Sequence, residues 1–294
     1  VDVMRGGPST GIPAKSEQSD LSFAVSGLHG DAPRLVLAPN SIADCIATTH
    51  WAVQLAEALQ APAIVLSDQF MGQSRAIIDR PADDAGTAQR LTAAADTPDY
   101  KRYRDTPSGV SPMAIPGTPG VTYTADGLEH SELGTPSSQA RDHRLQLDKR
   151  ERKLLRYDYG PRWADIEAPG GGSALAVITF GSVSGSVREA VARAAKQGVA
   201  VRLIVLRLLA PALPERMEQA LAGVKQVLVV EQNHGAQLLR WLRAMHDLPG
   251  RPASFHRPGP LPLRPGELTT AIVDWAHAHR SDNPTESQAE KEMA

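Results

Sequence analysis

The sequence contains few of the features that mark several common classes of protein. It has a single cysteine, Cys45, in 294 residues. One thiol can neither close an internal disulfide nor supply the four thiolates that usually hold an iron–sulfur cluster. We therefore expect a reducing, cytoplasmic environment.

Excess positive charge and long apolar runs are also missing. The chain has 31 Lys and Arg against 33 Asp and Glu, which gives a formal net charge of −2. Proteins that bind nucleic acid or a membrane surface electrostatically need a surplus of Lys and Arg. No apolar run reaches the roughly 18 residues that span a bilayer, and residues 1–7 lack the apolar region of a signal peptide. We expect a globular protein with no nucleic-acid or membrane partner.

The motifs of several enzyme classes are missing as well. The sequence has no Gly-Lys-Ser/Thr ending of a phosphate-binding Walker loop and no His-Glu-x-x-His. The segment 181–185 does not complete Gly-x-Gly-x-x-Gly, which favours a tight turn over a dinucleotide site. The residues alone therefore predict no metal site and no self-contained catalytic set.

The second half of the chain alternates strands with helices. Continuous apolar runs predict buried strands at 174–180, 199–206 and 227–230, and helical patterns fill 214–222, 236–245 and 265–279. A further helix is predicted to begin at Ser186, with Glu189 completing a capping box, and to end at Gly198. Strands and helices at this spacing predict a parallel α/β sheet.

The first half has a shorter version of the same pattern. Strands are predicted at 1–4, 34–38 and 61–66, and Ser41 with Asp44 is predicted to cap a helix that reaches Gln60. The face of this helix that is predicted to be buried consists of Ile42, Cys45, Ile46, Thr49, Val53, Ala56 and Leu59. Because the chain starts on a strand and lacks an initiator methionine, we expect it to be a fragment of a longer protein.

Residues 80–162 form a long segment rich in proline, glycine and charge. A helical pattern occurs in it around 141–155, where Asp148 and Arg152 have the spacing of an ion pair. Connections this long are usually functional or wrap a partner. The predicted organisation is an N-terminal domain at 1–95, a connector at 96–168, a C-terminal domain at 169–280 and a disordered tail at 281–294.

One turn is a candidate binding site. The sequence Arg5-Gly-Gly-Pro-Ser-Thr-Gly11 follows the first predicted strand, and its glycines allow backbone amides to approach an anion closely. Arg5 could hold a carboxylate through two parallel hydrogen bonds, and Ser9 and Thr10 could add hydroxyl donors. The alternative is an ordinary Gly/Pro turn in which the arginine bonds a neighbouring carbonyl. The residues alone leave both possibilities open.

Five stretches, in this order, resemble the α-subunit of 2-oxoacid:ferredoxin oxidoreductases. They are residues 5–21 (RGGPSTGIPAKSEQSDL), 66–73 (LSDQFMGQ), 127–132 (GLEHSE), 149–154 (KRERKL) and 229–238 (VVEQNHGAQL). The first is specific to that family's substrate loop. The resemblance implies the later part of a thiamine-enzyme pyrimidine-type domain, followed by a transketolase C-terminal-like α/β domain.

The resemblance also implies an activity that needs a second subunit. The family oxidises a 2-oxoacid, here most closely 2-oxoglutarate, with CoA, and it releases an acyl-CoA, CO₂ and reduced ferredoxin. It implies a β-subunit that holds the diphosphate of thiamine diphosphate, Mg²⁺ and the iron–sulfur cluster. The acidic residue that activates the cofactor would lie upstream of Val1, so no catalytic residue is assigned.

The resemblance assigns roles to three residues of the turn. Arg5 matches the arginine that contacts the substrate carboxylate, Thr10 matches the threonine of the same turn, and Ser9 lies between them. Ala14 departs from the family, since many members have a threonine contact there. Two alternatives are a thiamine enzyme that does not use ferredoxin, of transketolase or 2-oxoacid dehydrogenase type, and a non-catalytic assembly subunit.

Overall fold

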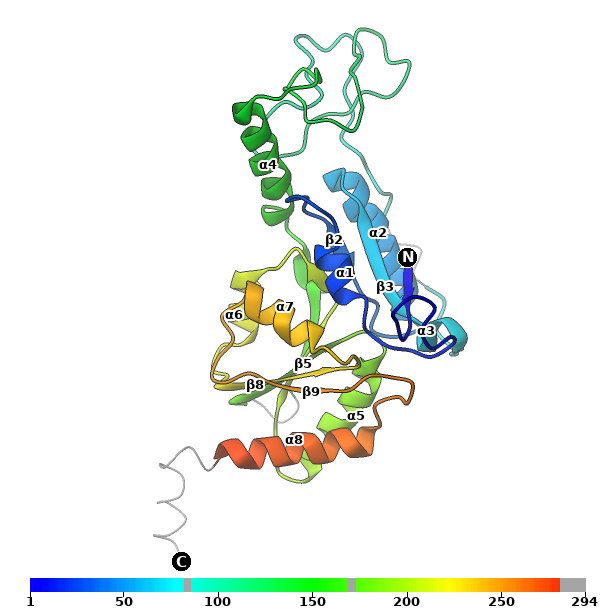
Figure 1. The fold of residues 1–294 in the computed structure, drawn as a ribbon, viewed down its shortest axis with the longest axis vertical. Coiled ribbons are helices and arrows are strands. Elements are labelled where there is room, and N and C mark those ends of the chain that lie inside the picture. The colour runs from blue at the N-terminus through cyan, green and yellow to red at the C-terminus, as the bar shows by residue number, and fades with distance from the viewer. Residues whose placement is uncertain (82–85, 169–172, 281–294) are drawn as a thin grey trace, which may run out of the picture.

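The computed structural model describes residues 1–81, 86–168 and 173–280, and the predicted tail at 281–294 lies outside these residues. Two α/β units are stacked along the long axis, with the connector and helix α4 at one end and helix α8 at the other (Figure 1). No helix in the described residues is long and apolar enough to cross a membrane.

The first unit is a four-stranded sheet in the order β1-β3-β2-β7. Its strands are β1 (Asp2–Met4), β3 (Ala63–Asp68), β2 (Leu35–Leu37) and β7 (Leu208–Ala210), and its helices are α1 (Leu21–Ser26), α2 (Asp44–Leu59) and α3 (Gln69–Gln73). The first three strands are parallel, whereas β7 runs antiparallel to β2. Since β7 comes from the second half of the sequence, the two halves share this sheet.

The second unit is a five-stranded sheet in the order β4-β6-β5-β8-β9. Its strands are β4 (Ala164–Glu167), β6 (Arg202–Leu206), β5 (Leu175–Phe180), β8 (Gln226–Glu231) and β9 (Ala253–His256), and its helices are α5 (Val183–Lys196), α6 (Pro214–Ala220), α7 (Gln237–Met245) and α8 (Pro265–Arg280). Only the edge strand β4 is antiparallel among the described strands of this sheet. The predicted α/β class is confirmed, with mixed rather than purely parallel sheets.

Alternate residues of the central strands β5, β6 and β8 pack into two separate cores, as a strand buried on both faces requires. One core lies against α5 and α8 and includes Val177, Leu203 and Leu228. The other includes Ile178 and Ile204, and it continues without a break into the first sheet. The two sheets therefore share a hydrophobic core. The proposed domain boundaries stay a prediction.

Helix α5 begins earlier than predicted. It starts at Val183, so the capping box of Ser186 and Glu189 is wrong. Gly181 turns the chain at the end of β5 with φ = 70°, and Ser184 Oγ donates to the carbonyl of Asn40 at 2.7 Å. The helix is therefore started by the turn and by a contact with the first unit. Its predicted end is confirmed, because Gly198 follows the last turn with φ = 78°.

Helix α2 starts at Asp44 with Ala43 at its N-cap, so the predicted cap at Ser41 is early, and the predicted apolar stripe is wrong except at Leu59. The amide of Asp44 donates to Ser41 Oγ at 3.1 Å, and the Asp44 carboxylate accepts from the amide of Asn40 at 2.8 Å. Ile46 and Val53 are 44% and 51% exposed. The buried side is Thr48, Trp51, Ala52, Leu55 and Leu59. The helix has apolar residues on most sides, so the stripe with the large Trp51 side chain buries the greater area.

The connector contains the predicted helix, α4 (Ala140–Leu155). The 3₁₀ helix Gly160–Trp163 follows it. The predicted Asp148–Arg152 ion pair is wrong, because Arg152 pairs with Asp105 of the connector and Asp148 lies 3.9 Å from Arg144. A charged side chain of helix α4 therefore bonds the irregular connector beside it.

Arg207, between β6 and β7, joins the two units electrostatically. Its guanidinium lies 2.9 Å from the Asp44 carboxylate at the start of α2 and 3.1 Å from the Asp165 carboxylate of β4. The side chains of Arg207 and Asp44 are 13% and 15% exposed, so water screens this pair only in part. Removing the arginine would leave the Asp44 carboxylate without its cationic partner, whereas Asp165 would keep its ion pair with Arg188 at 3.0 Å.

We expect Arg207→Met to lower the free energy of unfolding by roughly 2–3 kcal/mol, since charged hydrogen bonds are lost and the largely buried Asp44 carboxylate is left without a cationic partner. Urea unfolding followed by circular dichroism measures the change. Arg193→Met is the matched control, because Arg193 pairs only with the exposed Glu189 one turn away among the described residues. An equal effect of both substitutions would contradict a joining role for Arg207.

Candidate functional site

The turn after β1 is closed by backbone hydrogen bonds. The amide of Ile12 donates to the carbonyl of Gly6 at 2.7 Å, and the amide of Gly6 donates to the carbonyl of Lys15 at 3.3 Å. Gly11 has φ = 53°, and a Cβ on it would lie 1.6 Å from the carbonyl oxygen of Gly6. The turn therefore requires glycine at position 11, whereas a Cβ on Gly7 would meet nothing within 4 Å.

A cavity of about 610 Å³ opens beside this turn. It is lined by Asp2, Val3, Arg5, Gly7, Pro8, Ser9, Asp20, Phe23, Ala24, Ile64 and Gln69. The structure thus brings Arg5 and Ser9 to one cavity, and it places Thr10 on the exposed side of the turn, outside the lining. The walls combine one arginine with apolar side chains from α1 and β3, a combination that suits a small acid with a short carbon chain.

The Arg5 side chain is exposed, and its guanidinium has no hydrogen-bond or ion-pair partner among the described residues. The alternative raised by the sequence, an arginine bonded to a neighbouring carbonyl, would have occupied these donors. They are instead available to a carboxylate that enters the cavity. An arginine offers two parallel N–H donors for that purpose.

Carboxylates of the chain surround Arg5. Burial raises the pKa of Asp20, with further increases from Asp2 and Glu17, while Arg5 acts in the opposite direction. Burial also raises the pKa of Asp2. With one cation and two carboxylates in its lining, the cavity would repel the concentrated charge of a diphosphate. Among the described residues, no group of three or more His, Cys, Asp or Glu could hold a metal ion.

Gln18 ties the segment after the turn to the end of β8. Its Nε2 donates to the carbonyl of Phe180 at 2.8 Å, and its Oε1 accepts from the backbone amide of Gln232 at 2.8 Å. The amide of Gln18 in turn donates to the carbonyl of Gln232 at 2.7 Å. Both glutamines are buried, at 1% and 4% exposed. We call this set of bonds the glutamine clasp.

Neighbouring residues extend the clasp. Ser16 Oγ donates to the Asp68 carboxylate at the end of β3 at 3.2 Å, and the Glu17 carboxylate accepts from the amide of Gly259 at 2.9 Å. The buried Glu231 carboxylate caps α7 by accepting from the amides of Leu238 and Leu239. The segment that follows the Arg5 turn is therefore fixed to both units.

The five stretches singled out in the sequence form two groups in space. Residues 5–21, 66–73 and 229–238 meet at the clasp. Residues 127–132 and 149–154 meet in the connector, where Arg150 forms an ion pair with Glu129. Sequence reasoning missed Gln18 and Gln232 as positioning residues. Their bond joins residues 214 positions apart, and no local pattern signals such a contact.

Two family models match the chain. Residues 1–149 match the model described as "Pyruvate flavodoxin/ferredoxin oxidoreductase, thiamine diP-bdg". Residues 174–247 match "Pyruvate:ferredoxin oxidoreductase core domain II". The first match alone covers about half of the sequence and contains the Arg5 turn.

Several curated proteins are similar to the chain. The 2-oxoacid:ferredoxin oxidoreductase subunit alpha of Saccharolobus solfataricus is 32% identical over 240 residues, which cover 80% of this chain and 38% of that protein. The 2-oxoglutarate oxidoreductase subunit KorA of Mycobacterium tuberculosis is 36% identical over 246 residues, which cover 82% of this chain and 37% of that protein. The chain thus spans less than two fifths of the length of these relatives.

A solved structure has the same fold. It is described as the 2-oxoglutarate:ferredoxin oxidoreductase from Magnetococcus marinus with 2-oxoglutarate, coenzyme A and succinyl-CoA bound. It matches with a TM-score of 0.83 and 37% identity, over 93% of this chain and 47% of that one.

We expect Gly11→Ala to destabilise the turn, because its Cβ would collide with the Gly6 carbonyl and because alanine disfavours a positive φ. The free energy of unfolding should fall by more than about 1 kcal/mol, as is usual for alanine at a strained glycine position. Gly7→Ala tests the same turn at a position with open space. Urea unfolding of both variants gives the comparison, and equal stability of the two would contradict the described turn.

Proposed function

The chain belongs to the family of 2-oxoacid:ferredoxin oxidoreductase α-subunits, as its five stretches predict, and we propose that it acts in the oxidation of 2-oxoglutarate. The proposed reaction converts 2-oxoglutarate and CoA to succinyl-CoA, CO₂ and reduced ferredoxin. The 2-oxoglutarate relatives named above support this choice of substrate. The observation that carries the proposal is the guanidinium of Arg5, which has no partner among the described residues and lines a cavity of about 610 Å³.

In the proposal, Arg5 receives the carboxylate next to the oxo group through two parallel hydrogen bonds. Ser9 adds a hydroxyl donor from the cavity wall, and Thr10 adds one from the exposed side of the same turn. Phe23, Ala24 and Ile64 pack against the carbon chain. The glutamine clasp holds the turn that carries Arg5 in a fixed position, which limits the entropy lost when substrate binds.

The proposal divides the cofactors between subunits. Thiamine diphosphate, when bound, supplies the electron sink that decarboxylation requires. Because Arg5 is the one cation that lines the cavity, we assign the diphosphate and its Mg²⁺ to the β-subunit. The single cysteine likewise assigns the iron–sulfur cluster to a partner subunit. Ferredoxin is the proposed electron acceptor, and the proposed partners are the β-subunit, ferredoxin, the 2-oxoacid and CoA.

The proposal is tested by anaerobic ferredoxin reduction with the α-subunit that contains this chain, co-purified with its β-subunit. We expect reduction with 2-oxoglutarate and CoA, and weaker activity with pyruvate or a branched 2-oxoacid. Arg5→Ala should lower kcat/KM on the order of 100-fold, since a charged two-point contact is lost. Arg5→Lys should fall between the two, because lysine keeps the charge without the paired donors.

The control is Arg193→Ala, which removes an arginine on the exposed side of α5. It should leave the kinetics unchanged. Turnover of a 2-oxoacid without ferredoxin reduction would indicate a different thiamine enzyme. Full activity of Arg5→Ala would indicate an assembly role for this chain, and either result would overturn the proposal.

A further inference from the structure

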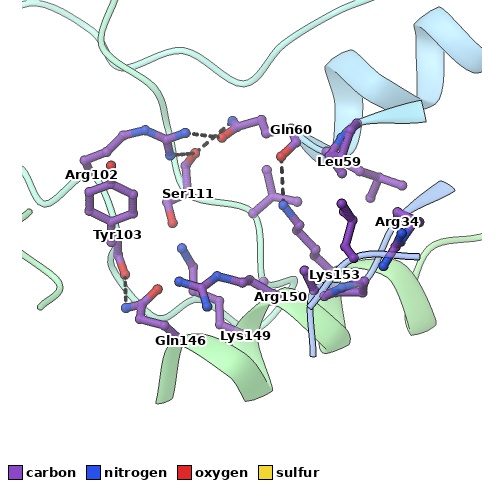
Figure 2. Close-up of a pocket in the computed structure, with 17 residues that line it drawn as sticks. Arg34, Leu59, Gln60, Arg102, Tyr103, Ser111, Gln146, Lys149, Arg150 and Lys153 are labelled. Atoms are coloured by element: carbon purple, nitrogen blue, oxygen red, sulfur yellow. Dashed lines mark hydrogen bonds between the residues drawn. The ribbon is translucent and has the colours of Figure 1, made fainter. Parts of the chain in front are cut away.

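A second cavity, of about 320 Å³, lies beside the end of α2 and is lined by positive charge. Its walls come from the end of α2, the loop before β2, the connector and helix α4 (Figure 2). Five cationic side chains line it: Arg34, Arg102, Lys149, Arg150 and Lys153. We call it the basic cavity. It shares no lining residue with the cavity beside Arg5.

Three of these five cations are bonded only to neutral acceptors among the described residues. Arg34 donates to the carbonyl of Ala24 at 3.3 Å, Arg102 donates to Gln60 Oε1 at 2.7 Å, and Lys153 donates to the carbonyl of Gln60 at 2.8 Å. Carbonyl and amide oxygens position a cation without neutralising it. The charges of these side chains therefore remain available to an anion.

Arg150 is the one lining cation with a carboxylate partner among the described residues, since it pairs with Glu129. Glu129 also accepts from His143 at 2.8 Å, so its charge is divided between two partners. The nearby Asp105 is bound to Arg152, which does not line the cavity. The described residues thus leave the basic cavity with a clear excess of positive charge.

Lys149 is the most informative of the five. It is 7% exposed, and its ammonium has no hydrogen-bond acceptor among the described residues. Figure 2 shows the side chain extending from α4 into the cavity beside the guanidinium of Arg150. Burial, together with Arg102, Lys153 and Arg150, lowers the pKa of Lys149 to about 8, against the opposing effect of Asp105.

Lys153 shows the same effect from a neighbouring position. Burial, with Arg102 and Arg150, lowers its pKa to about 8. A buried charge without a partner is unfavourable for folding, and buried lysines in proteins are normally paired. Lys149 meets this condition, and the partly buried Lys153 is bonded only to a neutral carbonyl, so the geometry indicates a site whose counter-charge the described residues do not supply.

We propose that the basic cavity binds the phosphate or diphosphate group of a small molecule. A volume of about 320 Å³ is at the lower end of the range for ligand pockets and suits the charged end of such a ligand. A phosphate group has several acceptor oxygens and at least one full charge, so it can engage cations that approach from several elements. The inference does not depend on the proposed oxidation of 2-oxoglutarate.

The test is calorimetric titration of the full chain with pyrophosphate, orthophosphate, CoA and, as a carboxylate control, glutarate. We expect pyrophosphate to bind. Lys149→Met should weaken that binding roughly 10- to 100-fold, the effect of losing a charge-assisted bond. Lys196→Met is the matched control at the last, exposed turn of α5, and Arg5→Ala tests the other cavity. Both should bind like the unaltered chain.

Stability separates a ligand-binding lysine from a structural one. Lys149→Met removes an unpaired buried charge, so the variant without ligand should unfold at a higher temperature than the unaltered chain. A structural lysine would give the opposite result. Dependence of CoA binding on Lys149 would identify CoA as the source of the phosphate, and pyrophosphate binding alone would indicate a free diphosphate or another nucleotide.

Protection of lysines from chemical labelling tests the proposal on the unaltered chain. Lysines are acylated at pH 8 with an amine-reactive ester and quantified by mass spectrometry, with and without pyrophosphate. We expect pyrophosphate to lower labelling of Lys149 several-fold and to leave Lys196 unchanged. Absence of both binding and protection, or equal binding by Lys149→Met, would overturn the proposal. So would protection of Lys149 by glutarate as strong as that by pyrophosphate.

Discussion

The hydrogen bonds between Gln18 and Gln232 are the constraint on which the candidate substrate site depends. They join a segment near the N-terminus to the end of β8, across 214 residues of sequence. Both side chains are buried, where a lost bond leaves a polar group without water to replace its partner. The exposed turn that carries Arg5 is short and has two internal backbone bonds, so its position depends on the pairing of β1 with β3 before it and on this attachment after it.

The two units are joined at several further points that support the same arrangement. Arg207 links the start of α2 to β4, and Ser184 of α5 bonds Asn40 before α2. Strand β7 completes the first sheet with residues from the second half of the chain. A displacement of one unit relative to the other would break these contacts together. The arrangement therefore favours a rigid platform for the substrate turn.

Much of the fold could be predicted from the sequence, because buried strands such as β5 and β8 are continuous apolar runs. The short strands β4, β7 and β9 were missed, since three or four residues have no distinctive period. The prediction of the buried side of α2 was wrong, because Ile46 and Val53 belong to an apolar stripe that faces outward. Such choices depend on tertiary packing, which local sequence does not contain.

In the candidate sites, too, some residues could be predicted from local sequence and others depend on tertiary packing. Arg5 and Ser9 stood out because glycines surround them in a short motif, and they line one cavity. The contribution of Gln18 and the isolation of Lys149 could not be predicted, because each depends on which distant groups lie beside it. Helical spacing even suggested a wrong partner for Arg152, which pairs with Asp105 of the connector.

The most direct test of this account is amide hydrogen exchange at Ile12, whose N–H closes the substrate turn on the carbonyl of Gly6. Gln18→Met removes both side-chain bonds of the clasp while nearly keeping the volume of the side chain and the backbone bond to Gln232, and Gln197→Met is an exposed control. The account predicts that exchange at Ile12 becomes about tenfold faster in Gln18→Met, the effect of losing roughly 1–2 kcal/mol of local stability. Unchanged exchange at Ile12 in that variant would contradict the claim that the clasp positions the turn.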